Sequence, residues 1–426
     1  MIHGLTDYLA RSLTPYHATQ EAISILSNNG FVVLDETEDW DLQVGGKYVV
    51  VRGGSSFIAF TIGNLDRFCY KIVAAHTDSP CLKLKENPVK KDGAYATLNV
   101  ETYGGFNWQT FLDRPLQIAG RVVKDVNGKL VQETVTSSFK VTIPTLAIHQ
   151  NRDVNNGATL NPQVDLLPLY ALDSEEIATE RLLQKIGGDG VVSFDLSLVN
   201  ADMPYTFGVN DEFIASPRID NLTSVYAGIY SLLSRPQSQG VCVVACLDHE
   251  EVGSRSPQGA DGEFVPTVLK RIAACLRFDE SEYYKALASS FLVSADNAHA
   301  MHPNHPEKCD PTNKTLLGGG IAIKQHCSKM YITEGVSSAV LKKIFAKAGV
   351  KYQNFFNRSD MKSGSTLGWY LQRTLGTIGA DIGIAQLAMH SACECFAKAD
   401  FDALVGGLEG FFNSEIVYGK DGVTVE

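Results

Sequence analysis

The chain has 426 residues, of which 44% are hydrophobic and 20% charged, and its formal net charge is −11. This length allows two domains and a large buried core, and the composition is that of a globular protein. The negative charge argues against nucleic acid as the main partner, because phosphate binding requires a basic surface. No apolar run reaches the roughly 18 residues that a membrane helix needs, so we expect no membrane partner.

Cysteine usage and the first residues indicate the compartment. The nine cysteines include no CxxC pair, which is typical of reduced thiols and not of a disulfide framework. The first twenty residues lack the charged and then apolar pattern of a signal peptide. We therefore predict a cytoplasmic protein.

The first part of the chain has helical and then strand patterns. Residues 1–30 carry apolar side chains at helical spacing, and the runs KYVVVRGG, SFIAFTIG and CYKIVAAHTDSP follow. KIVAA is a continuous apolar run, typical of a strand that is buried on both faces. It ends directly in His76, Thr77 and Asp78.

A second pattern extends over residues 86–215. Its strand-like segments PLQIAGRVVK, SSFKVTIPTLAIH and GVVSFDLSLVN alternate with turn signals, and we predict a separate β-rich domain inserted into the first. From Asp220 the α/β pattern returns, with the helix TSVYAGIYSLL and the strands GVCVVACL and FLVSA. The sequence therefore predicts an α/β protein in which a discontinuous domain, 1–85 and 216–426, surrounds the insert.

Three apolar runs end abruptly in side chains that can bind a metal. They are VAAHTD, VVACLDHEE and FLVSAD, and the segments RIDN and AMHS add two more such positions. In open α/β sheets the chemistry lies beyond the carboxyl ends of the strands. Each segment alone would fit a solvated turn, but the joint set of two His, two Asp and one Glu suits zinc, manganese or cobalt. We predict a metal site at His76, Asp220, Glu251, Asp296 and His390.

Glu250 and Glu251 form an adjacent acidic pair after a buried run. Neighbouring side chains of an extended segment point to opposite faces, so the two carboxylates should not share one role. Glu251 can bind metal while Glu250 faces the substrate water as a general base. The alternative is an acidic pair on the surface, which the preceding CVVACL run disfavours.

Five segments carry a family resemblance. AAHTDSP, SPRIDNL, LDHEEVGS, SADNAHA and AMHSACE resemble the signature blocks of the M18 family, the aspartyl aminopeptidases, and occur in that family's order. The resemblance covers nearly the whole chain and includes the N-terminal TPYHA element. It implies a zinc-peptidase-like domain, with a mixed, mostly parallel sheet flanked by helices, and an inserted β-rich dimerisation domain.

The resemblance also implies a co-catalytic site with two divalent ions, zinc in the first place and manganese or cobalt as alternatives. Asp220 would bridge the ions, with His76 and Asp296 on one and Glu251 and His390 on the other. Asp78 would hydrogen-bond the His76 imidazole and fix its tautomer. Related two-metal peptidases commonly have a cis peptide after the bridging aspartate, which here is the bond to Asn221.

The activity that follows is removal of N-terminal residues from peptides. The two ions would acidify a shared water, Glu250 would take its proton, and the proton would pass to the leaving amine. Acidic first residues are expected substrates, and Lys324 in LGGGIAIKQHCSKMYIT is the candidate contact. This block and NRSDMKSGSTLG depart from the commoner family forms, so a broader or neutral specificity stays open. Lys324 could also be an ordinary exposed lysine.

Assembly is a further implication of the resemblance. The insert would build dimers that form a closed tetrahedral dodecamer. TLAIHQNR resembles the block that carries a histidine into the partner subunit's active site, which makes His149 a candidate for substrate binding and oxyanion stabilisation. The alternative is a histidine satisfied within its own turn.

Two rival functions remain. A deacylase or carboxypeptidase could use the same fold, because fold alone does not determine the substrate. A non-catalytic scaffold is the other, and the presence of Glu250 argues against it, since a scaffold needs no base beside its ligands.

Overall fold

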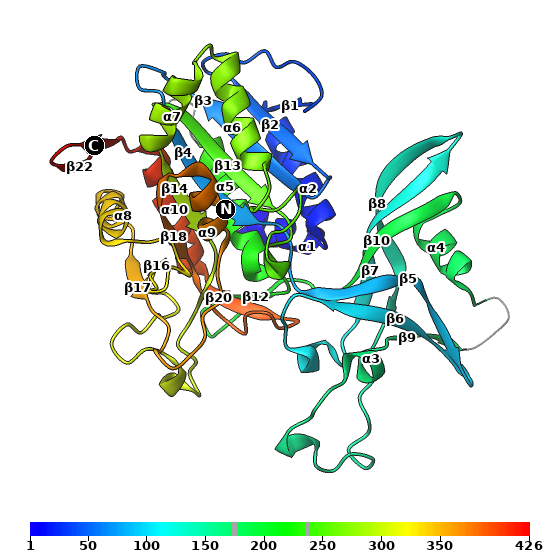
Figure 1. The fold of residues 1–426 in the computed structure, drawn as a ribbon. Coiled ribbons are helices and arrows are strands. Elements are labelled where there is room, and N and C mark those ends of the chain that lie inside the picture. The colour runs from blue at the N-terminus through cyan, green and yellow to red at the C-terminus, as the bar shows by residue number, and fades with distance from the viewer. Residues whose placement is uncertain (173–176, 235–238) are drawn as a thin grey trace.

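The computed structural model describes residues 1–172, 177–234 and 239–426. A nine-stranded sheet lies between two layers of helices, and a second, six-stranded sheet extends to one side (Figure 1). The first sheet is mixed and mostly parallel, which confirms the predicted α/β class. In spatial order its strands are β1 (Val32–Leu34), β2 (Lys47–Arg52), β3 (Ser56–Ile62), β13 (Val241–Leu247), β4 (Tyr70–His76), β14 (Phe291–Ala295), β18 (Ile378–Gly383), β16 (Ile321–Lys324) and β17 (Tyr352–Phe355).

The central strands of this sheet are mostly apolar because both of their faces are covered. Every residue of β4 and β13 is buried, as expected for parallel strands between two helical layers. One layer contains α1 (Ile2–Arg11), α2 (Pro15–Asn28), α5 (Ile219–Leu233), α8 (Gly335–Lys347) and α10 (Lys398–Asn413). The other contains α6 (Phe264–Cys275), α7 (Glu280–Ala288) and α9 (Leu367–Leu375).

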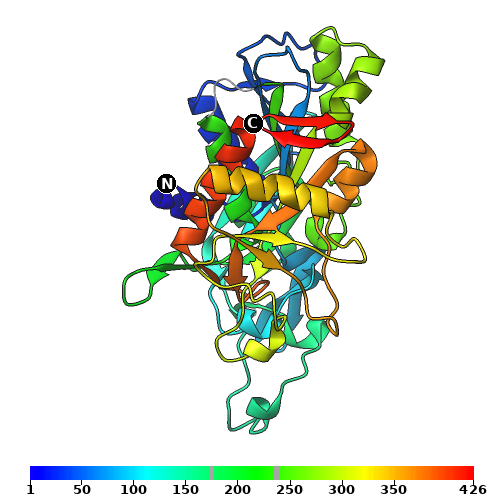
Figure 2. The same ribbon diagram turned by 90° about the vertical axis from the view of Figure 1, so that its left-hand side faces the viewer.

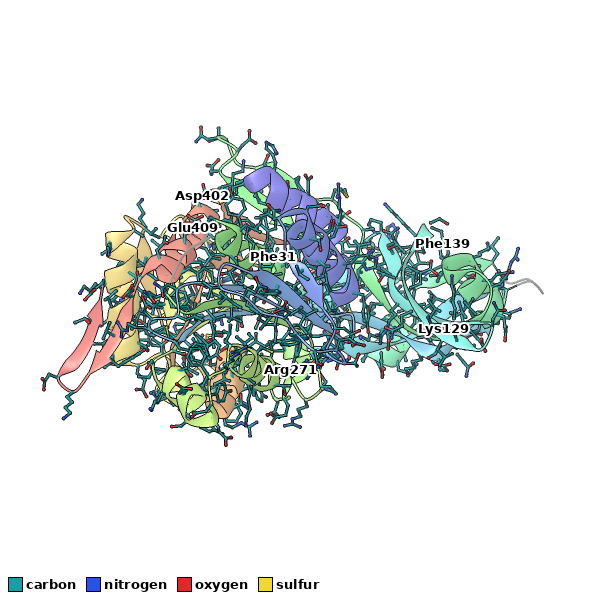
Figure 3. The ribbon with its side chains drawn as sticks, turned by 90° about the horizontal axis from the view of Figure 1, so that it is seen from above. Phe31, Lys129, Phe139, Arg271, Asp402 and Glu409 are labelled. Carbon is teal, nitrogen blue, oxygen red and sulfur yellow. The ribbon has the colours of Figure 1, made fainter. Side chains whose placement is uncertain are left out.

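Figure 3 looks along the layers, with Arg271 of α6 on one side of the sheet and Asp402 and Glu409 of α10 on the other. Figure 2 shows the yellow helix α8 and the red C-terminal hairpin in front of the sheet. This hairpin consists of β21 (Ile416–Gly419) and β22 (Gly422–Val425). Both layers therefore close over the sheet and leave its carboxyl end to the loops.

The six-stranded sheet is antiparallel throughout. Its strands are β8 (Lys129–Val141), β7 (Leu116–Val126), β10 (Val191–Asn200), β5 (Cys81–Asp92), β6 (Tyr95–Tyr103) and β9 (Leu169–Leu172), in spatial order. A core of its own forms beneath α4 (Thr179–Gly187), and α3 (Pro162–Asp165) packs against β6. Residues 86–215 are the proposed insert, and β5 begins a few residues before this range.

A five-stranded sheet joins the two larger ones. It contains β11 (Tyr205–Phe207), β12 (Phe213–Ser216), β20 (Glu394–Ala397), β19 (Ala385–Leu387) and β15 (Ala298–His299). Strand β12, near the end of the proposed insert, pairs with β20 near the C-terminus. The short 3₁₀ helices are η1 (Trp108–Phe111), η2 (Val154–Asn156), η3 (Glu250–Val252) and η4 (Pro306–Lys308).

The helical pattern expected in the first thirty residues is confirmed and forms two helices, because Pro15 opens the second helix at a position where its missing N–H is harmless. One local expectation differs from the structure. The strand expected in SSFKVTIPTLAIH ends at Val141, and residues 144–150 form a loop. Pro144 contributes to this end, since proline cannot donate a strand hydrogen bond.

No helix within the described ranges is long and apolar enough to cross a membrane.

Candidate active site

The carboxyl end of the nine-stranded sheet carries the predicted metal ligands. His76 is the last residue of β4, Asp296 follows β14, and Glu251 lies in η3, just beyond β13. Asp220 lies at the start of α5, where the backbone is not yet helical, and His390 lies in the turn before β20. Because parallel strands end at one edge of the sheet, these distant segments come together there.

The five side chains form two groups that share one carboxylate. His76, Asp220 and Asp296 offer ligand atoms within 4.8 Å of one another, and so do Asp220, Glu251 and His390. His76 Nε2 is 3.5 Å from Asp220 Oδ1, and His390 Nε2 is 3.2 Å from Asp220 Oδ2. The two oxygens of Asp220 thus face different histidines, as a bridging carboxylate requires.

The donor set fits a cationic ligand. Asp220 Oδ1 and Glu251 Oε1 are buried, and neither accepts a hydrogen bond from the described residues. Burial opposes protonation of His390, but the carboxylates of Asp220 and Glu251, at 3.2 and 3.1 Å from its Nε2, raise its pKa to about 12. Carboxylates packed this closely bind positive charge, and two divalent ions would supply it.

Glu250 is adjacent to these proposed ligands, and it lines one cavity together with all five of them. It also forms a group with His76 and Glu251 in which the ligand atoms lie within 4.8 Å of one another. Burial, reinforced by the carboxylates of Asp296 and Glu251, raises the pKa of Glu250 well above its ordinary value. The side chain is therefore a stronger proton acceptor than a solvated glutamate.

The peptide bond between Asp220 and Asn221 is cis, which confirms that expectation. The segment is held from two sides. Glu394 Oε2 accepts a hydrogen bond of 2.9 Å from the Asp220 backbone N–H, and Asn221 Nδ2 donates to the Ala295 carbonyl at 2.7 Å. Glu394 Oε1 also accepts a bond of 2.7 Å from the backbone N–H of His390. One buried carboxylate thus orients the backbone of two proposed ligands.

Asp78 contacts His76 differently from the expectation. The His76 Nδ1 atom is 3.0 Å from the backbone oxygen of Asp78 and 3.4 Å from its carboxylate oxygen Oδ1. The carboxylate accepts its hydrogen bonds from the backbone N–H groups of Glu250 and Glu251, each at 3.1 Å, and from the hydroxyl of Tyr103 at 2.7 Å. Asp78 therefore orders the turn that carries the proposed base as well as the histidine.

Lys324 is buried, with 3% of its surface exposed, and is not the exposed lysine of the alternative reading. Its Nζ donates to the backbone oxygens of Asp296 and Asn297, at 3.0 and 2.9 Å. Burial lowers the pKa of Lys324, but Asp296 and nearby Tyr331 outweigh burial and raise it above the ordinary value. The side chain is a fixed cation in the cavity wall.

A cavity with a volume of about 460 Å³ is lined by all five proposed metal ligands and by Glu250. His299, Tyr331 and Phe355 line it beside Lys324, and none of these three residues was predicted from the sequence. His299 had a usable signal, because it lies three residues after Asp296 in the SADNAHA block. Tyr331 and Phe355 had none, since an aromatic side chain in a loop or at a strand end is also a common core residue.

His149 is exposed and is not one of the residues that line this cavity. It lies in the loop between β8 and α3, which extends away from the nine-stranded sheet (Figure 1). The role predicted for His149 lies in the active site of a partner subunit, and that role stays a prediction.

Comparisons with known proteins agree with this geometry. The family described as aminopeptidase I zinc metalloprotease (M18) matches residues 8–412. A probable M18 family aminopeptidase 2 of Clostridium acetobutylicum is 39% identical over 422 residues, covering 96% of this chain and 98% of the relative. The corresponding protein of Stutzerimonas stutzeri is 37% identical over 423 residues, covering 96% and 97%.

Solved structures share the fold. A chain from the complex of Ape4 and Nbr1 is 35% identical, with a TM-score of 0.92, and the match covers 96% of this chain and 84% of that one. The M18 aminopeptidase of Thermotoga maritima is 23% identical, with a TM-score of 0.84 and coverage of 96% and 94%. The buried cluster of histidines and carboxylates, the family match over nearly the whole chain and these relatives lead to one conclusion: the chain belongs to the M18 family and is a metallo-aminopeptidase.

Proposed function

We propose that this aminopeptidase removes N-terminal residues, with a preference for Asp and Glu, at a two-metal site in which Glu250 is the general base. The observation that carries the proposal is the shared carboxylate of Asp220. It belongs to two groups of potential ligands, and Glu250 lies beside both in the wall of one cavity.

The residues of the two groups suit two divalent ions, zinc first and manganese or cobalt as alternatives. His76 and Asp296 would hold one ion, Glu251 and His390 the other, and Asp220 both. When bound, such a pair of ions makes water acidic enough to attack a carbonyl near neutral pH.

The protein residues then carry the proton. Glu250 accepts it from the attacking water and returns it to the amine that leaves. Asp78 supports this transfer by accepting the backbone N–H groups of Glu250 and Glu251, which keeps the base and the ligand in one rigid turn.

The acidic preference rests on the charge of the cavity wall. Lys324 is a cation that lines the cavity, whereas burial and the charge of Lys324 lower the pKa of the neighbouring His299 and favour its neutral form. A carboxylate of the substrate's first residue would meet this positive charge, while the substrate's free α-amine would face the carboxylates of the metal groups. The alternative of a neutral specificity has support as well, because the Lys324 ammonium already donates hydrogen bonds to two main-chain oxygens.

For the assembled state we propose a homo-oligomer in the cytoplasm. A structure of S. cerevisiae mApe1, with a TM-score of 0.82 and 24% identity, is described as a dodecamer. Dimers built through the insert, assembled to a tetrahedral dodecamer, would bring the exposed His149 of one subunit to the cavity of another. There its imidazole would donate a hydrogen bond to the developing oxyanion.

The test is a panel of chromogenic amides that differ in the first residue, with N-acylated and C-terminal substrates as controls, assayed before and after chelation. We expect Asp and Glu amides to be cleaved fastest, chelation to abolish activity, and zinc to restore it. Faster cleavage of neutral amides would exclude the acidic preference. Activity on the acylated substrates alone would indicate a deacylase, and activity on C-terminal substrates alone a carboxypeptidase.

A further inference from the structure

The end of β6 at Tyr103 and the segment that follows it, residues 104–110, connect the six-stranded sheet directly to the candidate active site. The carbonyl oxygen of Gly105 lies 2.6 Å from Nδ1 of His390, which leaves Nε2 to face the proposed metal position. The backbone N–H of Asn107 donates to the His390 carbonyl at 3.0 Å, and Thr110 Oγ1 accepts from the Ala392 N–H at 2.8 Å. Three successive contacts therefore hold the His390 turn from the side of the insert.

The same segment approaches the turn of Glu250 and Glu251. Gly104 has a φ of 73°, and a Cβ atom there would lie 3.1 Å from the Cβ of Glu251. Only a residue without a side chain permits this approach without displacing its neighbours. The preceding residue, Tyr103, donates its hydroxyl proton to Asp78 Oδ2 at 2.7 Å.

Asp78 connects this hydroxyl to the reaction site. Its carboxylate is 1% exposed, and its two oxygens accept the backbone N–H groups of Glu250 and Glu251. A carboxylate with this many donors has little freedom to rotate. The Tyr103 hydroxyl is the donor that comes from the six-stranded sheet, whereas the other two belong to the turn that must be oriented.

We propose that Tyr103 is a positioning residue: its hydroxyl fixes the Asp78 carboxylate, and through it the turn that carries Glu250 and Glu251. The inserted sheet thereby sets the geometry of the active site of its own chain. This inference rests on the proposed roles of Glu250 and Glu251. It differs from the role proposed for His149, which acts across a subunit boundary.

The ring and the hydroxyl of Tyr103 have separable roles. The ring packs 6.3 Å from the His249 ring, and Lys83 Nζ lies 4.6 Å from its centroid. Tyr103→Phe keeps both ring contacts and removes the hydrogen bond alone. Tyr95→Phe is the matched control, because Tyr95 lies on the same strand with 53% of its surface exposed.

The first experiment measures kcat and KM of both variants on the amide that the wild type cleaves best. It also measures zinc affinity of the metal-free proteins by competition with a chromophoric chelator. For Tyr103→Phe we expect kcat to fall about 10- to 100-fold, or zinc to bind about 10- to 100-fold more weakly, with KM within about twofold. Tyr95→Phe should leave all three unchanged, and thermal unfolding of both variants should match the wild type.

The second experiment asks whether Tyr103 acts through Asp78. In an Asp78→Asn background the Tyr103→Phe change should cost less than about twofold, because the connected carboxylate is already lost. An unaltered kcat and zinc affinity in Tyr103→Phe would overturn the proposal, as would an undiminished loss in the Asp78→Asn background. The proposed function is tested separately, since it fails if Glu250→Gln retains full activity, whatever the Tyr103 variants do.

Discussion

The two large sheets differ in how they use their side chains. The central strands β4 and β13 are buried over their whole length, and the potential metal ligands stand at or beyond their carboxyl ends. In β6 of the second sheet, buried positions alternate with exposed or half-buried ones along the strand. A strand covered on both faces can offer chemistry only where it ends, whereas a strand with one open face offers a surface along its length.

This difference suggests a division of roles. The proposed metal ligands and base meet at the carboxyl end of the nine-stranded sheet, whereas the segment between β5 and β10 supplies an exposed loop with His149 and the residues that reach Asp78 and His390. Substitutions at the end of the nine-stranded sheet should abolish catalysis. Substitutions in the six-stranded sheet should alter the orientation of the active-site residues, the assembly of subunits or the stability of the fold.

The proposed base should show the largest effect. Glu250→Gln preserves the shape of the side chain but removes the proton acceptor, so kcat should fall by about 10² to 10⁴. Metal analysis of the purified variant should still find two ions per chain. Loss of one ion in this variant would mean that Glu250 is itself a ligand, and that the roles of Glu250 and Glu251 need to be exchanged.

His149 tests whether the insert contributes to the chemistry of a second subunit. His149→Ala should lower kcat by about 10² to 10³, the usual cost of an oxyanion donor. Mixing it with Glu250→Gln chains should then restore activity. If the two variants exchange subunits freely, about half of the dimers contain one chain of each. In such a dimer, one active site has an intact Glu250 and receives an intact His149 from the partner chain. No recovery after verified exchange of subunits would exclude a role across the subunit boundary.

Lys324 tests the charge of the cavity wall. Lys324→Ala should raise KM for Asp and Glu amides by about tenfold or more, the value of a hydrogen bond to a charged group, and change KM for neutral amides less. An equal loss on all amides would assign Lys324 to the support of Asp296, whose backbone oxygen it contacts. Comparing the two substrate classes in one preparation separates these roles.

The smallest effect concerns the contact between helix α2 and the six-stranded sheet. His17 of α2 lies 2.9 Å from Thr136 Oγ1 of β8, and burial together with Arg218 lowers the pKa of His17 to about 4. Below about pH 6.5 the unfolded chain binds a proton that the folded chain does not, so stability should fall as the pH decreases from about 6.5 to 4. Urea unfolding at pH 7 and pH 5 should show this loss.

In His17→Gln the same loss between pH 7 and pH 5 should be smaller than in the wild type. His3→Gln is the control, because His3 is an exposed residue of α1. If both variants keep the pH dependence of the wild type, other groups govern stability in acid, and the contact between His17 and Thr136 does not contribute to it.

The sequence alone was sufficient for the strands that carry the ligands. Apolar runs that end in His76, Glu250 or Asp296 are local patterns, and a strand that is buried on both faces needs such a run wherever it lies. The resemblance to the M18 family added the order of the blocks and the cis bond after Asp220, which the structure contains. The α/β class and the β-rich character of the middle segment follow from periodicity in the same way.

The residues that hydrogen-bond around these proposed ligands could be found only from the tertiary fold. Tyr103 and Asp78 are 25 positions apart, and Glu394 is 174 positions from Asp220, yet each pair shares a hydrogen bond. Such contacts depend on how two sheets and a distant turn pack together, and nothing in the residues around Tyr103 or Glu394 encodes the partner. The burial of Lys324 has the same origin, because the oxygens that hold its ammonium belong to the loop after another strand.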